Sequence, residues 1–261
     1  MTAFIGLLKK DLGLMKFWYM IWLAFMFLGM IGIYALSVYT AEPNISVPFL
    51  VTMAGFHVFL APISLLYILN LEGKTQLWLY NTQSSIKLLL SKISTAAIIQ
   101  MVAQIFISLY ALFVMKVLQN QGLIDRFSDL LPFQQGFYMQ MGIFGISMYI
   151  SVWVIFLWTV YHSLGKYPAI RKFRWLAVIL VWFAYNLLEF FLVKTKLFKD
   201  ELFSFSINVN IAPKMDYEVK DGWHILYTDA SVPIMTITLY VIVSIIVFLL
   251  SSWLLDRKVE V

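Results

Sequence analysis

The chain has 261 residues, of which 62% are hydrophobic and 13% charged, and it carries a net charge of +5. Soluble domains average about 25% charged residues, so this composition excludes a water-soluble protein. The chain contains no cysteine, which excludes disulfides, thiolate metal sites and cysteine nucleophiles.

Six apolar stretches dominate the sequence. Each has roughly the 20 residues that a helix needs to cross the hydrocarbon core of a bilayer. The predicted spanning helices are residues 17–39, 47–71, 93–115, 137–161, 175–193 and 232–255. The sequence therefore predicts an all-α integral membrane protein, with a single transmembrane domain over 1–261 and both ends of the chain on one side.

Residues 1–16 precede the first spanning helix. Their pattern predicts a short amphipathic helix in the membrane interface. Apolar side chains recur at helical spacing at Ile5, Leu8 and Leu12. Lys9 and Lys10 lie among them and can reach lipid phosphates.

The second spanning helix contains His57 and Pro62. Because proline removes a backbone hydrogen bond, we expect a kink at Pro62. His57 has no acid and no second histidine three or four residues away. Because such partners are missing, we expect His57 to pack or form hydrogen bonds within the helix bundle. A role in a proton relay is the alternative.

Residues 72–92 form the predicted cytoplasmic connection to the third helix. The segment is polar enough to leave the membrane, yet its first half contains Leu77, Trp78 and Tyr80. A short helix along the membrane, a turn and a re-entry would fit this pattern. A plain interfacial connector is the simpler interpretation.

Two spanning helices carry polar residues at helical spacing. In the third, Gln100, Gln104 and Ser108 recur every four residues, a ridge that either holds helices together or lines a path. In the fifth, Asn186 and Glu189 share one face. A membrane-embedded carboxylate predicts either a substrate or gating contact or an interhelical hydrogen bond near the interface.

Residues 194–231 connect the fifth and sixth spanning helices. Their pattern predicts a small extracellular loop with β-like or mixed structure. Apolar residues at 203, 205, 207, 209 and 211 alternate with Ser and Asn, the period of a half-buried strand. We expect a turn at 213–216 and a returning strand through Trp223, Ile225 and Tyr227.

No motif in the sequence indicates an enzyme, a metal site or nucleic-acid binding. Gly73, Lys74 and Thr75 match the end of a phosphate-binding loop, but Ile68 occupies the position of its first glycine. Nucleophile turns and His-Glu-x-x-His metal sites are absent from the sequence. We therefore expect no catalytic residue and no cofactor bound by this chain.

Lysine and arginine are concentrated on the predicted side of the two termini. That side holds 12 of the 19: Lys9, Lys10, Lys16, Lys74, Lys87, Lys92, Lys166, Arg171, Lys172, Arg174, Arg257 and Lys258. These residues are kept cytoplasmic during insertion. Both termini are therefore predicted to be cytoplasmic.

The layout resembles the permease subunit of type-2 ABC exporters. The matching motif runs from Leu71-Glu72-Gly73-Lys74-Thr75 through Leu79 and Ser84-Ser85 to Leu88-Leu89-Leu90-Ser91-Lys92. That family places a Glu at the end of its second helix, then a coupling helix and a Leu-Leu-x-Ser-Lys re-entry. Many members have a proline midway, where this chain has Asn81 and Thr82.

The resemblance implies a bacterial cytoplasmic-membrane exporter of amphipathic peptides, such as phenol-soluble modulins, antimicrobial peptides or the substrates of lantibiotic immunity permeases. Two permease copies, most simply a homodimer, would bind two cytoplasmic ATPase subunits that hold ATP and Mg²⁺. The implied coupling residues are Glu72, Gly73, Lys74, Leu77, Trp78 and Tyr80. Two other classes stay open: a membrane receptor or immunity protein that does not transport, and an ion-coupled carrier.

Overall fold

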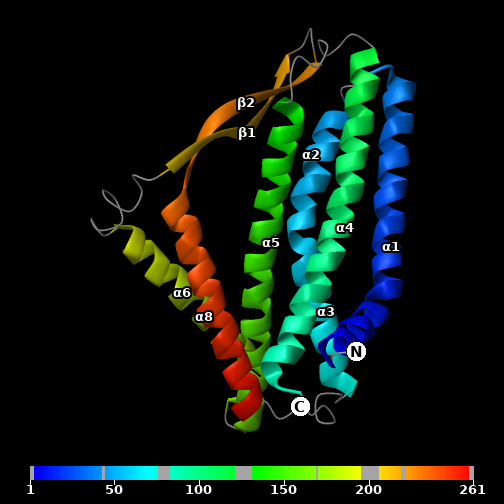
Figure 1. The fold of residues 1–261 in the computed structure, drawn as a ribbon. Helices are drawn as coiled ribbons and strands as arrows, with labels where there is room; N and C mark the ends of the chain where they lie inside the picture. The colour runs from blue at the N-terminus through cyan, green and yellow to red at the C-terminus, as the bar shows by residue number, and fades with distance from the viewer. Residues whose placement is uncertain are drawn as a thin grey trace.

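The computed structural model describes residues 3–42, 45–75, 83–120, 131–168, 170–194, 206–218 and 222–258. Within these ranges, six helical segments are long and apolar enough to cross a membrane, the architecture of a multi-pass membrane protein. The helices form an elongated bundle with a β-hairpin at one end (Figure 1). The described chain begins and ends at the opposite end, which we call the termini end.

The helices and strands follow the predicted order. They are α1 (Ala3–Thr40), α2 (Ser46–Phe56), the 3₁₀ turn η2 (His57–Phe59), α3 (Leu60–Thr75), α4 (Ser85–Asn120), α5 (Leu131–Ser163), the 3₁₀ turns η3 (Leu164–Lys166) and η4 (Arg171–Phe173), α6 (Arg174–Lys194), β1 (Ser206–Glu218), β2 (Gly222–Pro233) and α8 (Ile234–Lys258). Helix α4 begins inside the segment predicted to be a cytoplasmic connection. The re-entry into the membrane is therefore already helical at Ser85.

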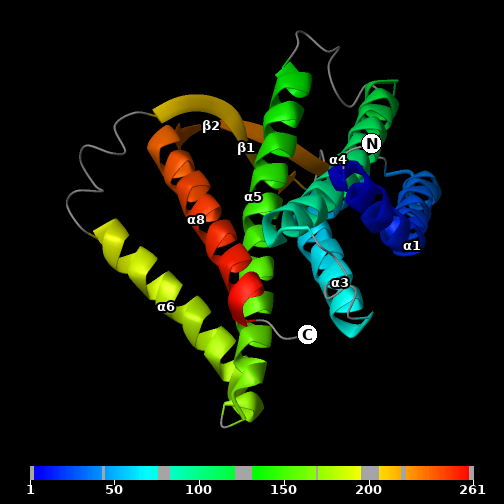
Figure 2. The ribbon, with the colours of Figure 1, turned by 60° about the horizontal axis from the view of Figure 1, so that its bottom comes forward.

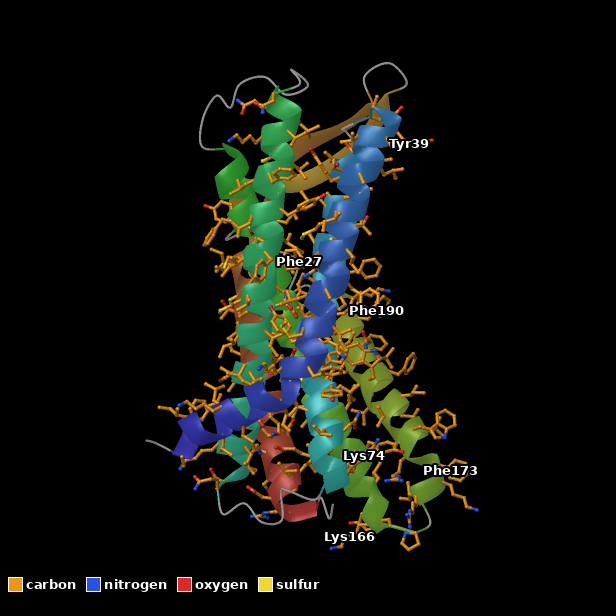
Figure 3. All side chains as sticks on the ribbon, turned by 90° about the vertical axis from the view of Figure 1, so that its right-hand side faces the viewer. Phe27, Tyr39, Lys74, Lys166, Phe173 and Phe190 are labelled. Carbon is orange, nitrogen blue, oxygen red and sulfur yellow. The ribbon has the colours of Figure 1, made fainter. Side chains whose placement is uncertain are left out.

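The N-terminal segment differs from the prediction. Residues 1–16 and 17–39 were expected to form two helices, but α1 is continuous from Ala3 to Thr40. Its first part bends away from the rest and runs across the termini end of the bundle (Figure 3). No proline interrupts the segment, and buried Asp11 and Met15 anchor the bent part, so the helix changes direction without ending.

The second membrane crossing is irregular where Pro62 predicted a kink. Proline has no N–H to donate to the carbonyl four residues earlier, which here belongs to Val58. The 3₁₀ turn η2 covers His57 to Phe59 and separates α2 from α3 at this position. The missing hydrogen bond thus explains why the crossing consists of two α-helices.

Helices α3, α4 and α5 enclose an apolar core near the termini end. Its fully buried members include Leu65, Leu69, Leu89 and Ile155. Trp158 on α5 donates from Nε1 to Oδ1 of Asn70 on α3 at 2.9 Å. Figure 2 shows α6 and α8 on one side of α5, and α1, α3 and α4 on the other.

The outer surface of the bundle is apolar. Phe17, Phe25 and Leu28 on α1 are 77%, 70% and 65% exposed. Helix α6 is the most exposed crossing, since none of its most apolar stretch is buried inside the described structure. A surface of this kind is stable against lipid rather than against water.

The strands β1 and β2 form an antiparallel hairpin between α6 and α8, as the alternating pattern predicted. The predicted turn at 213–216 is wrong, because Pro213 pairs with Tyr227 and Asp216 with His224. The ladder continues to the pair Glu218 and Gly222. In a two-stranded sheet both strands are edges, so a proline in β1 does not interrupt pairing. A register shift between Asn210 and Ala212 leaves Ile211 without a partner in the ladder.

Candidate functional site

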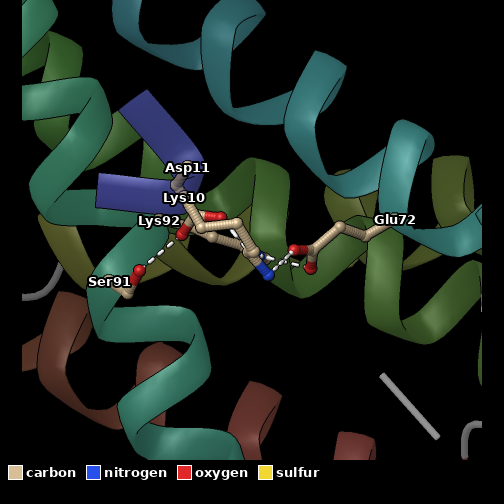
Figure 4. A network of polar contacts seen from close by, with 5 residues as sticks. All are labelled: Lys10, Asp11, Glu72, Ser91 and Lys92. Atoms are coloured by element: carbon tan, nitrogen blue, oxygen red, sulfur yellow. Dashed lines mark hydrogen bonds and ion pairs between the residues drawn. The ribbon is translucent and has the colours of Figure 1, made fainter. Parts of the chain in front are cut away.

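Charged side chains from three separate segments meet at the termini end of the bundle. Lys10 and Asp11 come from the bent part of α1, Glu72 from the end of α3, and Ser91 and Lys92 from the start of α4 (Figure 4). We call these five residues the ion network. Helices α3 and α4 flank residues 76–82, so the network lies at the base of the connection between them.

Lys92 is at the centre of the ion network. Its Nζ lies 2.6 Å from Oε2 of Glu72 and 3.4 Å from Oδ1 of Asp11. Lys10 also forms ion pairs with both acids, and its Nζ lies 3.7 Å from Oδ1 of Asp11. Ser91 donates a hydrogen bond from Oγ to Oδ2 of Asp11. Each carboxylate is therefore held by both ammonium groups.

The ion network is buried and balanced in charge. Asp11, Glu72 and Lys92 are only 1–2% exposed, Ser91 is fully buried, and Lys10 keeps 36% of its side chain exposed. Two carboxylates face two ammonium groups, which offsets the cost of removing these charges from water. Removal of one partner would leave an uncompensated buried charge, so the ion network holds α1, α3 and α4 in one arrangement.

A second polar contact joins α4 to the end of α8. Ser85 on α4 donates from Oγ to the carbonyl of Ser252 at 3.1 Å, and the two hydroxyls are also within hydrogen-bond distance. Both side chains are buried. The first turns of α4 are therefore connected to α1 and α3 by charges and to α8 by hydroxyls.

The six residues assigned to coupling are distributed unevenly over this region. Glu72 is buried in the ion network, Gly73 is half-buried and Lys74 is exposed. Leu77, Trp78 and Tyr80 lie outside the described residues. Glu72 is thus occupied by intramolecular ion pairs, whereas Lys74 at the end of α3 is open to a partner.

The polar residues of the spanning helices do not converge on one place. His57 is buried, its Nδ1 lies 2.7 Å from the carbonyl of Met53, and its ring contacts that of Trp22 edge-on. Gln104 donates to the carbonyl of Gln140 on α5 at 3.0 Å. Gln100, one turn away, is fully buried, and neither end of its amide has a hydrogen-bond partner among the residues that the structure describes.

The two polar residues singled out on α6 form different kinds of hydrogen bond, one within the helix and one between helices. Asn186 donates to the carbonyl of Trp182 on its own helix at 2.7 Å. Glu189 accepts a hydrogen bond of 2.6 Å from the hydroxyl of Tyr240 on α8. Glu189 therefore makes an interhelical hydrogen bond between α6 and α8, two helices that contribute no residue to the ion network.

Comparison with known proteins gives one relative over the full length of the chain. The chain is 28% identical over 264 residues to the uncharacterized protein YhcE of Bacillus subtilis (strain 168), with all of both chains covered. No protein-family model matches the chain. No solved structure matches it either.

An apolar groove lies between α1 and α4, with a volume of about 440 Å³. It is lined by Phe27, Met30, Ile31, Tyr34, Phe106, Leu109, Tyr110 and Phe113. Phe27 is at mid-height of the bundle (Figure 3). Both helices that border the groove are long and apolar enough to cross a membrane.

Asp11, Ser91 and Lys92 were not predicted as site residues. Lys92 was interpreted as an orientation signal and, with Ser91, as part of the family motif, and Asp11 was given no role. One signal was present: Asp11 is the single acid among residues 1–41, and it follows two lysines. Its partners lie 80 and 81 residues away, a pairing that only helix packing reveals.

Proposed function

We propose that the chain is the membrane-spanning permease subunit of an ABC exporter for amphipathic or hydrophobic peptides. Two copies work with two separate ATPase subunits, which bind ATP and Mg²⁺. The termini end faces the cytoplasm of a bacterium, and the hairpin end faces outward. The ATPase supplies the energy, and this chain supplies the path.

The ion network carries this proposal. A permease that is powered by a separate ATPase must transmit the conformational change of that ATPase from its cytoplasmic side to its spanning helices. Residues 76–82 are the receiving segment, and Glu72 and Lys92 link the helices on either side of it at 2.6 Å. Asp11 connects both helices to α1. Because separating buried opposite charges is costly, α1, α3 and α4 respond as one unit.

The distribution of basic residues supports the orientation. The described cations at the termini end include Lys74 at the end of α3 and Lys166 in η3, and in Figure 3 both are at the end of the bundle away from Tyr39. Arginine and lysine favour the cytoplasmic side of spanning helices. A receiving segment on that side is within reach of a soluble ATPase.

The cargo class is supported by the walls of the bundle. The groove between α1 and α4 is lined by aromatic and aliphatic side chains and suits the apolar face of an amphipathic helix. Peptides of this kind partition into the membrane first. Their route therefore begins at a lipid-facing surface.

Two measurements test the proposal. The tagged chain is extracted from its native membranes, and the captured proteins are identified by mass spectrometry. An ATPase with a phosphate-binding loop is expected among them. Inside-out vesicles containing both proteins should then accumulate a fluorescent amphipathic peptide only when ATP and Mg²⁺ are present.

Substitutions in the receiving segment make the test specific. Trp78→Ala with Tyr80→Ala should reduce ATPase capture and peptide accumulation together. The matched control is Trp175→Ala, since Trp175 is a 58% exposed tryptophan on α6. The permease assignment would be refuted if no ATPase were found among the proteins captured with the tagged chain. Peptide accumulation by vesicles that contain this chain alone would also refute it.

A further inference from the structure

Three helices bring tyrosine hydroxyls and one carboxylate together on the side of the bundle opposite α1. Tyr149 on α5 and Tyr185 on α6 share a hydrogen bond of 2.7 Å between their hydroxyls. Tyr240 on α8 donates to Oε1 of Glu189 on α6 at 2.6 Å. The rings of Tyr149 and Tyr240 are 5.2 Å apart and nearly perpendicular, which joins the two pairs into one cluster.

Two tryptophans extend this cluster. The ring of Trp153 on α5 lies 4.3 Å from that of Tyr185 and 5.3 Å from that of Trp182. Trp153 is buried, whereas Trp182 is 41% exposed at the outer face of α6. Five aromatic rings from three helices and one carboxylate thus form one connected cluster. We call them and Glu189 the aromatic cage.

The carboxylate in the aromatic cage has no cationic partner among the described residues. The ion pairs of the ion network do not include Glu189. Lys194, the next cation along α6, lies instead over the ring of Phe190, with Nζ 4.2 Å from the ring centroid. Phe190, the neighbour of Glu189, is at about mid-height of the bundle (Figure 3). A negative charge at this depth favours a cation close to it.

The aromatic cage is open to the surrounding lipid. Glu189 is half-buried and Tyr240 is 38% exposed. Leu187, Leu188 and Phe190, which flank the carboxylate along α6, are 44%, 56% and 53% exposed. A ligand can therefore approach from the bilayer, and its apolar part would stay against side chains that lipid tails otherwise cover.

We propose that the aromatic cage binds the ammonium group of an amphiphile, with Glu189 as counter-ion. Aromatic faces attract organic cations, and rings combined with a carboxylate select an ammonium over a neutral or anionic head group. The alkyl part of such a ligand lies along α6 and α8. The inference is independent of the proposed function, because a receptor could use the same site.

The experiment is a binding titration on the full chain in nanodiscs of neutral lipid. The probes are decyltrimethylammonium, decylamine and decanol, which share one alkyl chain and differ in head group. Binding is followed through the fluorescence of the tryptophans, two of which belong to the cage. A saturable change with either ammonium and a non-saturable one with decanol is expected.

Variants assign the signal to the cage. Glu189→Gln should weaken ammonium binding by about tenfold or more, because the cage then loses its counter-charge. Asp256→Asn on the same α8 side of the bundle removes an equal charge from an exposed position and should leave the affinity unchanged. Trp182→Leu changes an exposed residue and should also weaken binding, which keeps the test valid if Glu189→Gln misfolds.

The relative affinities of the two ammonium probes distinguish the possible natural ligands. Preference for decyltrimethylammonium would indicate a choline-type head group, and preference for decylamine a primary amine such as a lysine side chain of a peptide. Equal binding of decanol, or undiminished affinity in both Glu189→Gln and Trp182→Leu, would overturn the inference. Neither result depends on whether an ATPase is captured, so the two proposals fail separately.

Discussion

Glu72 at the end of α3 and Lys92 near the start of α4 form an ion pair with 2.6 Å between Oε2 and Nζ, and both side chains are almost completely buried. The pair joins two helices at the base of their connection. Asp11 and Lys10 from α1 complete the charge balance. Buried charges thus join three helices at the end of the bundle where the proposed ATPase would act.

Loss of one charge from this pair should destabilise the protein. Glu72→Gln is expected to lower the free energy of unfolding by about 3–5 kcal/mol, because Lys92 then lacks its nearest carboxylate in a buried position. The double variant Glu72→Gln, Lys92→Met restores the balance with Asp11 and Lys10 and should recover part of the loss. Thermal unfolding in detergent measures both. Lys87→Met, an exposed change on the same turns of α4, is the control, and an equal loss there would contradict the pairing argument.

Asp11 should hold the first part of α1 against the bundle. The cysteine-free sequence allows a single cysteine to be placed at Met15, which is 1% exposed, or at Lys16, whose charged side chain is exposed. In Asp11→Asn, loss of about 1.4 kcal/mol of local stability would raise maleimide labelling at position 15 about tenfold. Labelling at position 16 should stay fast both in the parent chain and in Asp11→Asn. Unchanged protection at position 15 would show that apolar packing alone holds this segment.

Gln100 and Gln104 should respond oppositely to the same substitution. Gln100→Leu removes a buried amide that has no hydrogen-bond partner in the described part of the chain, and it is expected to stabilise the protein by about 1–2 kcal/mol. Gln104→Leu removes the hydrogen bond to the carbonyl of Gln140 and should cost about 0.6 kcal/mol. Unfolding midpoints of the two variants provide the comparison. Strong destabilisation by Gln100→Leu would mean that this amide has a buried polar partner such as water.

Two glycines on α1 provide a matched test of the contact between α1 and α2. A Cβ at Gly29 would lie 3.1 Å from the ring of Phe49, whereas a Cβ at Gly32 would meet nothing within 4 Å. Gly29→Leu is therefore expected to cost about 1–3 kcal/mol through overpacking. Gly32→Leu should be neutral or stabilising by up to about 1 kcal/mol, since leucine favours the helix. Equal effects on the melting temperature would refute this close approach.

The sequence alone determined the elements that local chemistry controls. A run of about 20 apolar residues must be helical to satisfy its backbone in lipid, so the six crossings were predictable. Pro62 predicted the break at η2, and strict alternation predicted the strand that became β1. In each case, the cause lies within a few residues of its effect.

Only the tertiary structure decided which distant residues became partners. Lys92 could have been a surface cation, but packing of α3 against α4 places it beside Glu72, and the bend in α1 adds Asp11. The same packing gives Gln104 a hydrogen-bond partner and gives Gln100 none among the described residues, although both belong to one ridge. The turn of the hairpin was mispredicted because pairing along the whole ladder prevails over the local preference of Pro213. Such outcomes depend on the relative rotation and height of helices, which many weak contacts determine together.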